Sequence, residues 1–215
     1  MLSVYNYMGF GLAITGLVAF IVASTPALYV PIFTTPLKWV VMLAPLGFVF
    51  FLGARIQAMS TSAAQMTFWL FAAVMGISLA SIFLVFTGES IARVFFITAA
   101  TFGAVSLYGY TTKRDLSGMG SFLFMGLIGI IIASLVNIFL ASSALQFAVS
   151  VIGVLVFTGL TAWDTQRLKN EYLGGYQHAG GDIAAKGAIM GALSLYLNFI
   201  NLFMMLLQLF GSQRE

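Results

Sequence analysis

The stretch "VLVFTGLTAWDTQRLKNEYLGG", from Val154 to Gly175, places one carboxylate, Asp164, at the end of a long apolar run. A carboxylate in such surroundings can exchange a proton or bind a cation. Arg167 follows three residues later, where a helix would bring it beside Asp164. Three interpretations follow: Asp164 pairs locally with Arg167, it reaches interfacial water at the rim of a helix, or it is held inside the protein for a function.

The last apolar segment, "GAIMGALSLYLNFINLFMMLLQLF", carries amides that bear on this choice. Helical periodicity puts Ser194, Asn198 and Asn201 on one face. Asn198 lies about 18 Å along the axis from Lys186, at about 1.5 Å per residue, so it is deep in the segment. An amide at that depth must face protein, where it could meet Asp164 or form an ordinary interhelical hydrogen bond.

Other charged residues also lie in or beside apolar segments. Arg55 stands toward the same end of its segment as Asp164, so an ion pair between them is a further alternative. Glu89 and Arg93 are spaced as i and i+4. An acid at a helix N-terminus complements the helix dipole, and its i+4 partner would complete a local pair. Alternatively, Glu89 and Arg93 belong to an outer vestibule that collects ions.

Composition indicates which solvent surrounds these groups. Hydrophobic residues make up 61% of the 215 residues and charged residues 7%, whereas a soluble domain carries about a quarter charged residues. Much of the exterior must therefore face lipid, and a bilayer core takes roughly 20 apolar residues per helix. We expect an all-α integral membrane protein, a single transmembrane domain over residues 1–215 with seven helices. They are expected at Val4–Ala23, Leu37–Ala58, Gln65–Phe86, Ser90–Tyr110, Met119–Leu140, Leu145–Trp163 and Lys186–Phe210.

The connections between these segments have recognisable signals. Thr35 and Pro36 read as a cap and first-turn proline for the second helix. "LKNEYLGGYQHAGGDIAAK" is expected to be the one long loop. "GFGLAITG" and "GLIG" offer small surfaces for close helix packing, or simply reflect the glycine content of membrane helices.

The distribution of cations predicts the orientation. The N-terminal side of the membrane would hold six Lys and Arg residues and the other side three, which places the N-terminus in the cytoplasm and the C-terminus on the opposite side. The first group is Arg55, Lys113, Arg114, Arg167, Lys169 and Lys186, and the second is Lys38, Arg93 and Arg214. No long basic cluster occurs, so nucleic acid is excluded as a partner. The absence of cysteine excludes disulfides and thiolate metal sites.

Three stretches together closely resemble the bacterial branch of the Bax-inhibitor-motif (TMBIM) family: "TGESIARVFFITAATFGAVSLYGYTTKRDLSGMG", "VIGVLVFTGLTAWDTQRLKNEY" and "AIMGALSLYLNFINLF". The resemblance covers essentially the whole chain. It implies seven helices with the seventh central and wrapped by the other six, in a bacterial inner membrane. It also implies a pH-dependent calcium leak. By the same resemblance, an acid of the sixth helix and one of the seventh would share a proton, as in the family's characterised bacterial member, and an arginine of the second helix would latch to the first acid. Carried over by motif, these are Asp164 for the sixth-helix acid and Arg55 for the latch.

The seventh-helix acid does not carry over. Similar family members read "LSLYLDFINLF", whereas this chain reads "LSLYLNFINLF", with Asn198 in place of the second aspartate. Two close carboxyls cannot both ionise easily, so such a pair senses mild acidification, but an Asp–Asn pair lacks the second titrating group. Asn198 can donate its N–H to a charged Asp164. We therefore expect the geometry to persist and the pH response to be weakened or moved toward acid.

The leading expectation is a passive, pH-modulated Ca²⁺ leak without a cofactor, in which Asp164 binds Ca²⁺ weakly and transiently. Asn198 and Arg55 would act in the gate, and Ser194, Asn201 and Arg167 would support or line the path. Its partners would be lipid, Ca²⁺ and protons. The alternative is a regulator without transport activity that binds a membrane-bound quality-control protease or another membrane protein.

An enzyme is not expected. An aspartyl protease needs a second intramembrane aspartate, and zinc hydrolysis lacks its HExxH motif. His178 is the one histidine and lies in the glycine-rich "GGYQHAGGD" segment, where a solvated surface role fits best. A retinal protein would need a lysine deep in a helix, but Lys186 lies at a helix edge.

Overall fold

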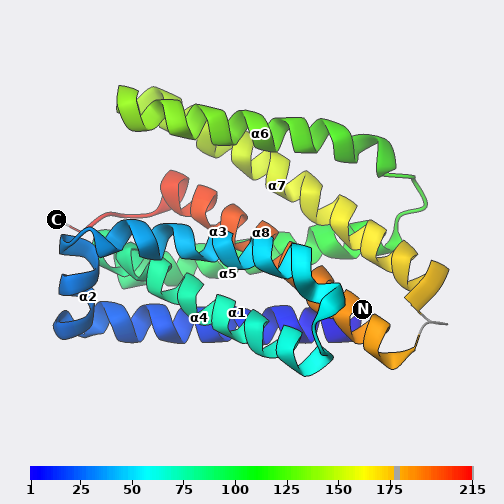
Figure 1. The fold of residues 1–215 in the computed structure, drawn as a ribbon. Coiled ribbons are helices and arrows are strands. Elements are labelled where there is room, and N and C mark those ends of the chain that lie inside the picture. Colours follow the sequence, from blue (N-terminus) through cyan, green and yellow to red (C-terminus); the bar gives the residue numbers. More distant parts are fainter. Residues whose placement is uncertain (177–179, 215) are drawn as a thin grey trace. The chain divides into compact units, whose positions relative to one another are not determined.

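The computed structural model describes residues 1–176 and 180–214, and within these residues the chain is helical apart from its connections and one isolated bridge between Phe86 and Gln213. Figure 1 shows the α-helices in chain order. They are α1 (Leu2–Ser24), α2 (Pro26–Thr34), α3 (Leu37–Arg55), α4 (Thr61–Val85), α5 (Gly88–Thr111), α6 (Ser117–Leu140), α7 (Ser143–Glu171) and α8 (Gly181–Phe210). A 3₁₀ turn at Ile56–Ala58 follows α3, and a π-helical turn at Tyr172–Tyr176 follows α7.

Seven helices of the described chain are long and apolar enough to cross a membrane, namely α1 and α3 to α8. This confirms the predicted class and number of spans. All seven contain the core of the segment predicted from the apolar runs, because a run of about 20 apolar residues is a strong signal. The expectation that the last span is central and wrapped by the other six stays a prediction.

The proline-rich connection after the first span is more ordered than the sequence indicated, since it contains α2. Pro26 occupies the first turn of α2, where its missing N–H removes no helical hydrogen bond. Figure 1 shows α2 running across the ends of α1 and α3 rather than along them. The predicted cap of α3 is wrong by one residue, because Pro36 and not Thr35 occupies the N-cap position. Thr35 still contacts the start of the helix, since its Oγ1 accepts a hydrogen bond from the Leu37 N–H at 3.3 Å.

The expected long loop between the last two spans is the main correction. Most of "LKNEYLGGYQHAGGDIAAK" is helical, because α7 continues to Glu171 and α8 starts at Gly181. The extension of α7 carries Arg167 and Lys169, both good helix formers, near its C-terminal end, where cations complement the helix dipole. The change from apolar to polar residues after Trp163 therefore marks the end of the apolar segment, whereas the helix itself continues to Glu171. His178 lies outside the described residues.

Contacts divide the chain into two compact units. Unit 1 comprises Met1–Thr87, Tyr172–Tyr196 and Gln213–Glu215, and unit 2 comprises Gly88–Glu171 and Leu197–Ser212. Helix α8 thus contributes its first part to unit 1 and its second part to unit 2. The prediction that residues 1–215 form one domain stays a prediction.

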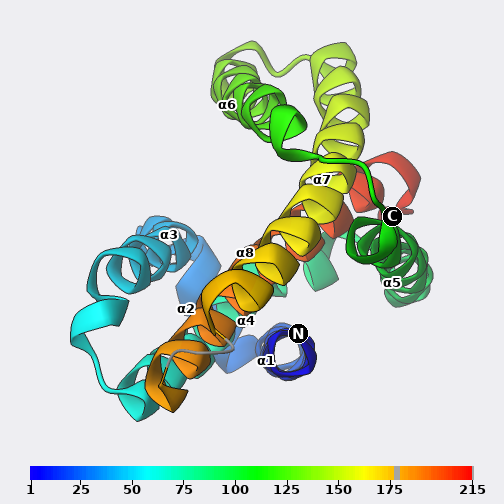
Figure 2. The same cartoon turned by 90° about the vertical axis from the view of Figure 1, so that its right-hand side faces the viewer.

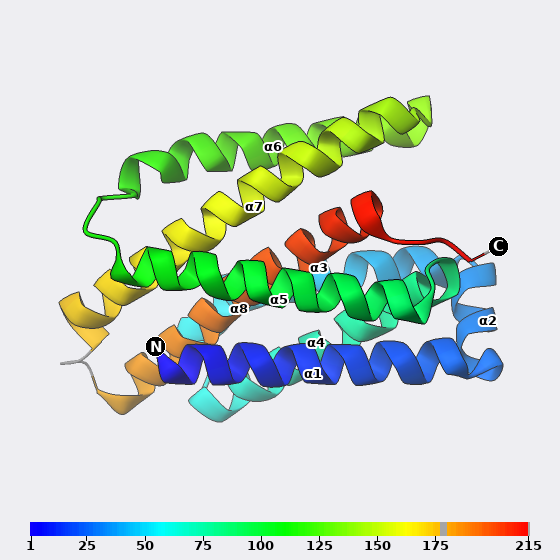
Figure 3. The same ribbon diagram turned by 180° about the vertical axis from the view of Figure 1, so that it is seen from behind.

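Unit 1 is built on the close approach of α1 and α4, which lie side by side in Figures 1 and 3. A Cβ at Gly76 of α4 would stand 2.6 Å from the carbonyl oxygen of Thr15 in α1, so only glycine allows this spacing. The Thr15 hydroxyl lies 2.8 Å from the Ala72 carbonyl oxygen and 2.6 Å from the Tyr196 hydroxyl. Tyr196 is fully buried, and its ring packs edge-on against Phe71.

Unit 2 is built around α7, which lies between α5 and α6 in Figure 2. A Cβ at Gly109 of α5 would overlap the backbone of Ala162, and one at Gly120 of α6 would overlap the indole of Trp163. Glycines of α5 and α6 therefore bring both helices onto the same turn of α7, the turn that carries Asp164. Of the glycines in the predicted "GLIG" surface, Gly126 contacts Val156 and Gly129 faces open space.

The α1–α4 contact gives the first test. We expect Gly76→Ala to destabilise the protein by roughly 1–3 kcal/mol, because the new methyl group overlaps the Thr15 backbone. Gly16→Ala is the matched control, since nothing lies within 4 Å of its added Cβ. Alanine is the better helix former, so the control should be neutral or stabilising. Thermal unfolding midpoints in detergent check both changes, and equal midpoints for the two variants would contradict the packing described.

Candidate functional site

Asp164 lies in unit 2 with a hydrogen-bond donor on each carboxylate oxygen. Its side chain belongs to α7, and the residue is only 6% exposed. Asn198 of α8 donates from Nδ2 to Oδ2 at 2.7 Å. Arg167, one turn further along α7, places Nη2 2.7 Å from Oδ1. The structure thus joins Asp164 to Asn198 and to Arg167 at once, whereas the sequence offered these contacts as alternatives.

Neighbouring hydroxyl groups are used by the helix backbones and not by the carboxylate. Thr161 donates to the Phe157 carbonyl oxygen at 2.7 Å, and Thr165 donates to the Thr161 carbonyl oxygen at 2.8 Å. Because a hydroxyl has one proton, Thr165 accepts from Ser106 of α5, whose Oγ lies at 2.9 Å. Asp164 therefore depends on Asn198 and Arg167 for charge-assisted contacts, which are the strong kind of hydrogen bond.

Arg167 is held by other residues of its own helix. Its guanidinium carbon lies 4.8 Å from the centre of the Trp163 ring, a cation–π contact. Its Nε is buried without a hydrogen-bond partner among the described residues, and Oε1 of Glu171 lies 3.7 Å from it. The Trp163 indole packs closely against Gly120 of α6. Arg167 is therefore positioned by packing against Trp163 as well as by its charge. Glu171 offers it a second acidic partner one turn beyond.

The residue between these groups, Gln166, fastens the connection from α5 to α6 onto α7. Its Oε1 accepts from the Leu116 N–H at 2.8 Å, and its Nε2 donates to the Arg114 carbonyl oxygen at 2.8 Å. Lys169 adds a bond from Nζ to the Tyr110 carbonyl oxygen at 2.8 Å. Sequence reasoning did not single out Gln166. The sequence signal that could have identified Gln166 is the same as for Asn198, namely an amide side chain within a predominantly apolar helix.

Asp115 shapes the same connection at the start of α6. The hydroxyl and backbone N–H of Ser117 both bond to its carboxylate and lower its pKa below the usual range. The backbone contact is 2.9 Å long. Asp115 is fully exposed, and it provides a charged residue outside the apolar windows with which Asp164 can be compared.

Other predicted site residues have different partners or belong to unit 1. Asn201 uses its Nδ2 to bond the Leu197 carbonyl oxygen of its own helix at 2.8 Å, and not Asp164. Arg55, exposed in the last turn of α3, and Ser194 of α8 both belong to unit 1. Their roles as latch and path lining stay predictions.

The expected ion pair between Glu89 and Arg93 is wrong. Glu89 lies in the first turn of α5, as predicted, but both side chains are exposed, and the ion pairs among the described residues of unit 2 all involve Arg167. Exposed partners gain little from pairing, because water solvates each charge. The outer-vestibule role of Glu89 and Arg93 stays a prediction.

The donor set at Asp164 suits a transient cation contact better than storage. No group of three or more His, Cys, Asp or Glu side chains that could hold a metal ion occurs among residues 1–176 and 180–214. Ca²⁺ takes about six to eight oxygen ligands, and both oxygens of Asp164 already have partners. A cation approaching this carboxylate would have to displace Arg167 or Asn198.

The Gln166 contacts predict a local change in protection. Gln166→Ala would leave the buried Leu116 N–H without its partner, a loss of about 1–3 kcal/mol. We expect the connection to open more often, so that trypsin cleaves after Lys113 or Arg114 several-fold faster. Gln57→Ala, a change at an exposed glutamine of unit 1, is the control and should leave the rate unchanged. An unchanged cleavage rate in Gln166→Ala would show that the Gln166 hydrogen bonds do not restrain the connection between α5 and α6.

The comparisons with known proteins agree over the whole chain. Residues 1–215 match the family described as "Inhibitor of apoptosis-promoting Bax1". The inner membrane protein YbhL of Escherichia coli (strain K12) is 51% identical over 217 residues, covering 100% of this chain and 92% of YbhL. An uncharacterized protein of Rickettsia prowazekii is 48% identical over 215 residues, covering 100% of this chain and 90% of that protein. With seven membrane-crossing helices and these matches, the chain belongs to the Bax1-inhibitor family of membrane proteins.

Proposed function

We propose that this membrane protein is a passive leak for cations, with Ca²⁺ as its main permeant ion, and that passage is controlled at Asp164. The observation that carries the proposal is the buried carboxylate of α7, bonded at 2.7 Å both to Asn198 and to Arg167. Among the similar proteins, YbhL of E. coli is called an inner membrane protein, and this name bears on the cellular location alone. We extend that location to this chain, with the N-terminus in the cytoplasm because of the cation distribution.

Energetics favour a functional reason for this acid. A charge within an apolar span is unfavourable unless it is paired or faces water, so such residues commonly mark ion or proton pathways. Asp164 is 6% exposed in a helix with a hydropathy typical of a membrane span. An apolar side chain could fill the same space without needing Arg167 or Asn198. The charge and its two donors therefore support a role in moving or sensing ions.

The contacts suggest how passage is controlled. Arg167 neutralises Asp164 and covers one of its oxygens, so a cation cannot use that oxygen while the pair is formed. Glu171 lies 3.7 Å from Arg167 Nε and provides a second carboxylate toward which the guanidinium can move. Release of Arg167 would expose a negative oxygen to a passing cation. A single carboxylate with amide neighbours binds Ca²⁺ weakly, which suits an ion that must also leave.

The response to pH should be weak, because Asn198 cannot titrate. The charged groups at this contact are Asp164, Arg167 and Glu171, and the position opposite Asp164 on α8 holds a neutral amide. A pair of carboxylates at this distance would share one proton and change charge with mild acidification. An acid paired with an amide has one fewer protonation step. The proposed leak therefore keeps the contact and loses most of its proton dependence.

Calcium flux into liposomes that contain this protein alone tests the leak. We expect Asp164→Asn to lower the flux roughly tenfold, since it removes the anionic oxygen and leaves Arg167 unpaired near the path, and a charge-assisted contact is worth about 1.5–3 kcal/mol. Asp115→Asn removes an exposed acid and should leave the flux unchanged. Absence of flux from the unmodified protein, with a membrane protease or other protein co-purifying, would favour the regulatory alternative instead.

The weak proton response has its own test. Asn198→Asp should create a shared-proton pair with Asp164, so that flux differs several-fold between mildly acidic and mildly alkaline buffer. Asn201→Asp is the matched control, because that amide bonds the Leu197 carbonyl oxygen and not Asp164. A steep pH dependence in the unmodified protein, equal to that of Asn198→Asp, would refute the assigned role of the asparagine.

A further inference from the structure

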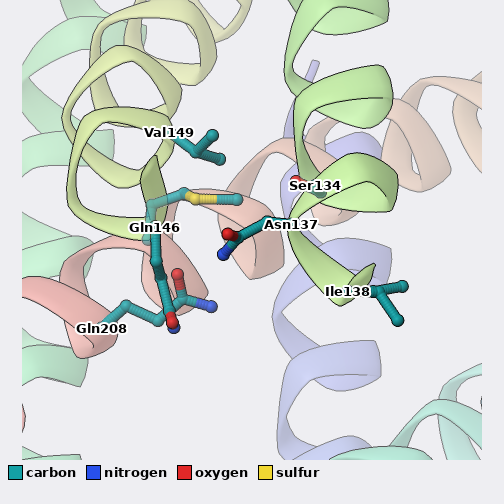
Figure 4. Close-up of a pocket in the computed structure, with 7 residues that line it drawn as sticks. Ser134, Asn137, Ile138, Gln146, Val149 and Gln208 are labelled. Carbon is teal, nitrogen blue, oxygen red and sulfur yellow. The ribbon is translucent and has the colours of Figure 1, made fainter. Parts of the chain in front are cut away.

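A polar pocket lies elsewhere in unit 2, between α6, α7 and the end of α8. Its volume is about 290 Å³, near the small end of the range for ligand pockets. Figure 4 shows its amide side chains, with Asn137 of α6 and Gln208 of α8 turned toward one another. The described residues that line it are all uncharged: Ser134, Asn137, Ile138, Gln146, Val149, Met205 and Gln208.

The hydrogen-bond partners of the lining side chains determine which ligand groups this pocket can bind. Asn137 Oδ1 accepts from the Ser142 backbone N–H at 2.9 Å, which fixes its amide nitrogen as the group left for the pocket. Gln208 Oε1 lies 2.8 Å from the Ser150 hydroxyl, which shares its proton with the Gln146 carbonyl oxygen at 2.9 Å. Because the amide oxygens of Asn137 and Gln208 have partners, these two side chains offer their N–H groups. Gln146 adds a third amide, with both a donor and an acceptor. The pocket therefore suits a ligand rich in hydrogen-bond acceptors.

The position of the pocket along the helices indicates where the ligand comes from. Asn137 is three residues before the end of α6 at Leu140, and Gln208 is two residues before the end of α8 at Phe210. At about 1.5 Å per residue, both amides lie within about 5 Å of a helix end. For helices that span the hydrocarbon core, this is the depth at which it meets the lipid headgroups. The amides thus lie where phosphate and ester oxygens of lipids are found.

The surface around the pocket is apolar and faces outward. Ile138 lines the pocket and is 70% exposed, and Phe139 beside it is 88% exposed. Phe147, next to Gln146 in α7, is 64% exposed. Such side chains in a membrane span contact acyl chains. A lipid could therefore place its headgroup among the amides and its chains along α6 and α7.

We propose that this pocket binds the phosphodiester of a membrane phospholipid through the amide nitrogens of Asn137 and Gln208. The lipid headgroup is held by neutral donors, because none of the described residues that line the pocket carries a charge. Binding therefore does not depend on the net charge of the headgroup and changes little with salt. The site is independent of the leak proposed above, since it involves neither Asp164 nor Asn198.

Native mass spectrometry of the detergent-purified protein with added phospholipid tests the site. Asn137→Asp keeps the oxygen that accepts from Ser142 but replaces the donor with a negative oxygen, and Gln208→Glu does the same at the other amide. We expect either change to reduce the bound phospholipid about tenfold. Asn6→Asp is the control, since that amide is exposed in α1 of unit 1 and should leave occupancy unchanged. Thermal unfolding of each variant confirms that it is folded.

Four ligands separate the sources of binding. A zwitterionic and an anionic phospholipid should bind alike, whereas diacylglycerol, which lacks the phosphate, should bind far less. Inorganic phosphate should not displace the lipid, because it gains nothing from the apolar surface of α6. Equal binding of diacylglycerol, displacement by inorganic phosphate, a strict requirement for an anionic lipid, or full occupancy in Asn137→Asp and Gln208→Glu would each overturn the proposal.

Discussion

A carboxylate within an apolar span has to be matched by donors, and in this protein that requirement organises the end of α7. Asp164 meets it with one partner from its own helix and one from α8. The Asn198 contact links residues far apart in the sequence, so it ties α7 to the second part of α8 within unit 2. The Arg167 contact is local and needs only helix geometry. Loss of either partner would leave a buried oxygen with unmet bonding capacity, which is unfavourable in a low-dielectric interior.

The same turn of α7 also carries the contacts that hold its neighbours. Glycines of α5 and α6 allow both helices to reach Ala162 and Trp163, immediately before Asp164. Gln166 and Lys169, two and five residues after it, bond the backbone at the end of α5 and in the connection to α6. A change in the charge state or pairing of Asp164 would therefore act on a segment that touches both neighbouring helices. These contacts support the proposal that Asp164 controls passage and is not an isolated buried acid.

Different parts of the structure were predictable to different degrees. The apolar runs predicted all seven spans, because the length of such a run reports directly on the bilayer. They did not predict α2, which is apolar but has only nine residues and contains two prolines. They also missed the extension of α7 to Glu171, because that part of the helix is polar. The i+3 spacing gave the Asp164–Arg167 pair, and helical periodicity placed Asn198 on an inward face. Periodicity could not predict which helix the Asn198 face of α8 contacts, because that depends on the tertiary packing. Gln166 escaped notice for the same reason, since its partners are backbone groups of a distant connection.

We propose that in a lipid bilayer the Asp164 carboxylate is ionised and in contact with the nitrogen donors of both Asn198 and Arg167. Solid-state NMR of the protein in liposomes measures this directly, through the ¹³Cγ shift of Asp164 and its dipolar couplings to the side-chain ¹⁵N of Asn198 and Arg167. We expect the chemical shift of an ionised carboxylate at neutral pH, with couplings to both residues that correspond to the 2.7 Å contacts. The shift of a protonated carboxyl group, or the absence of coupling to Asn198, would contradict it.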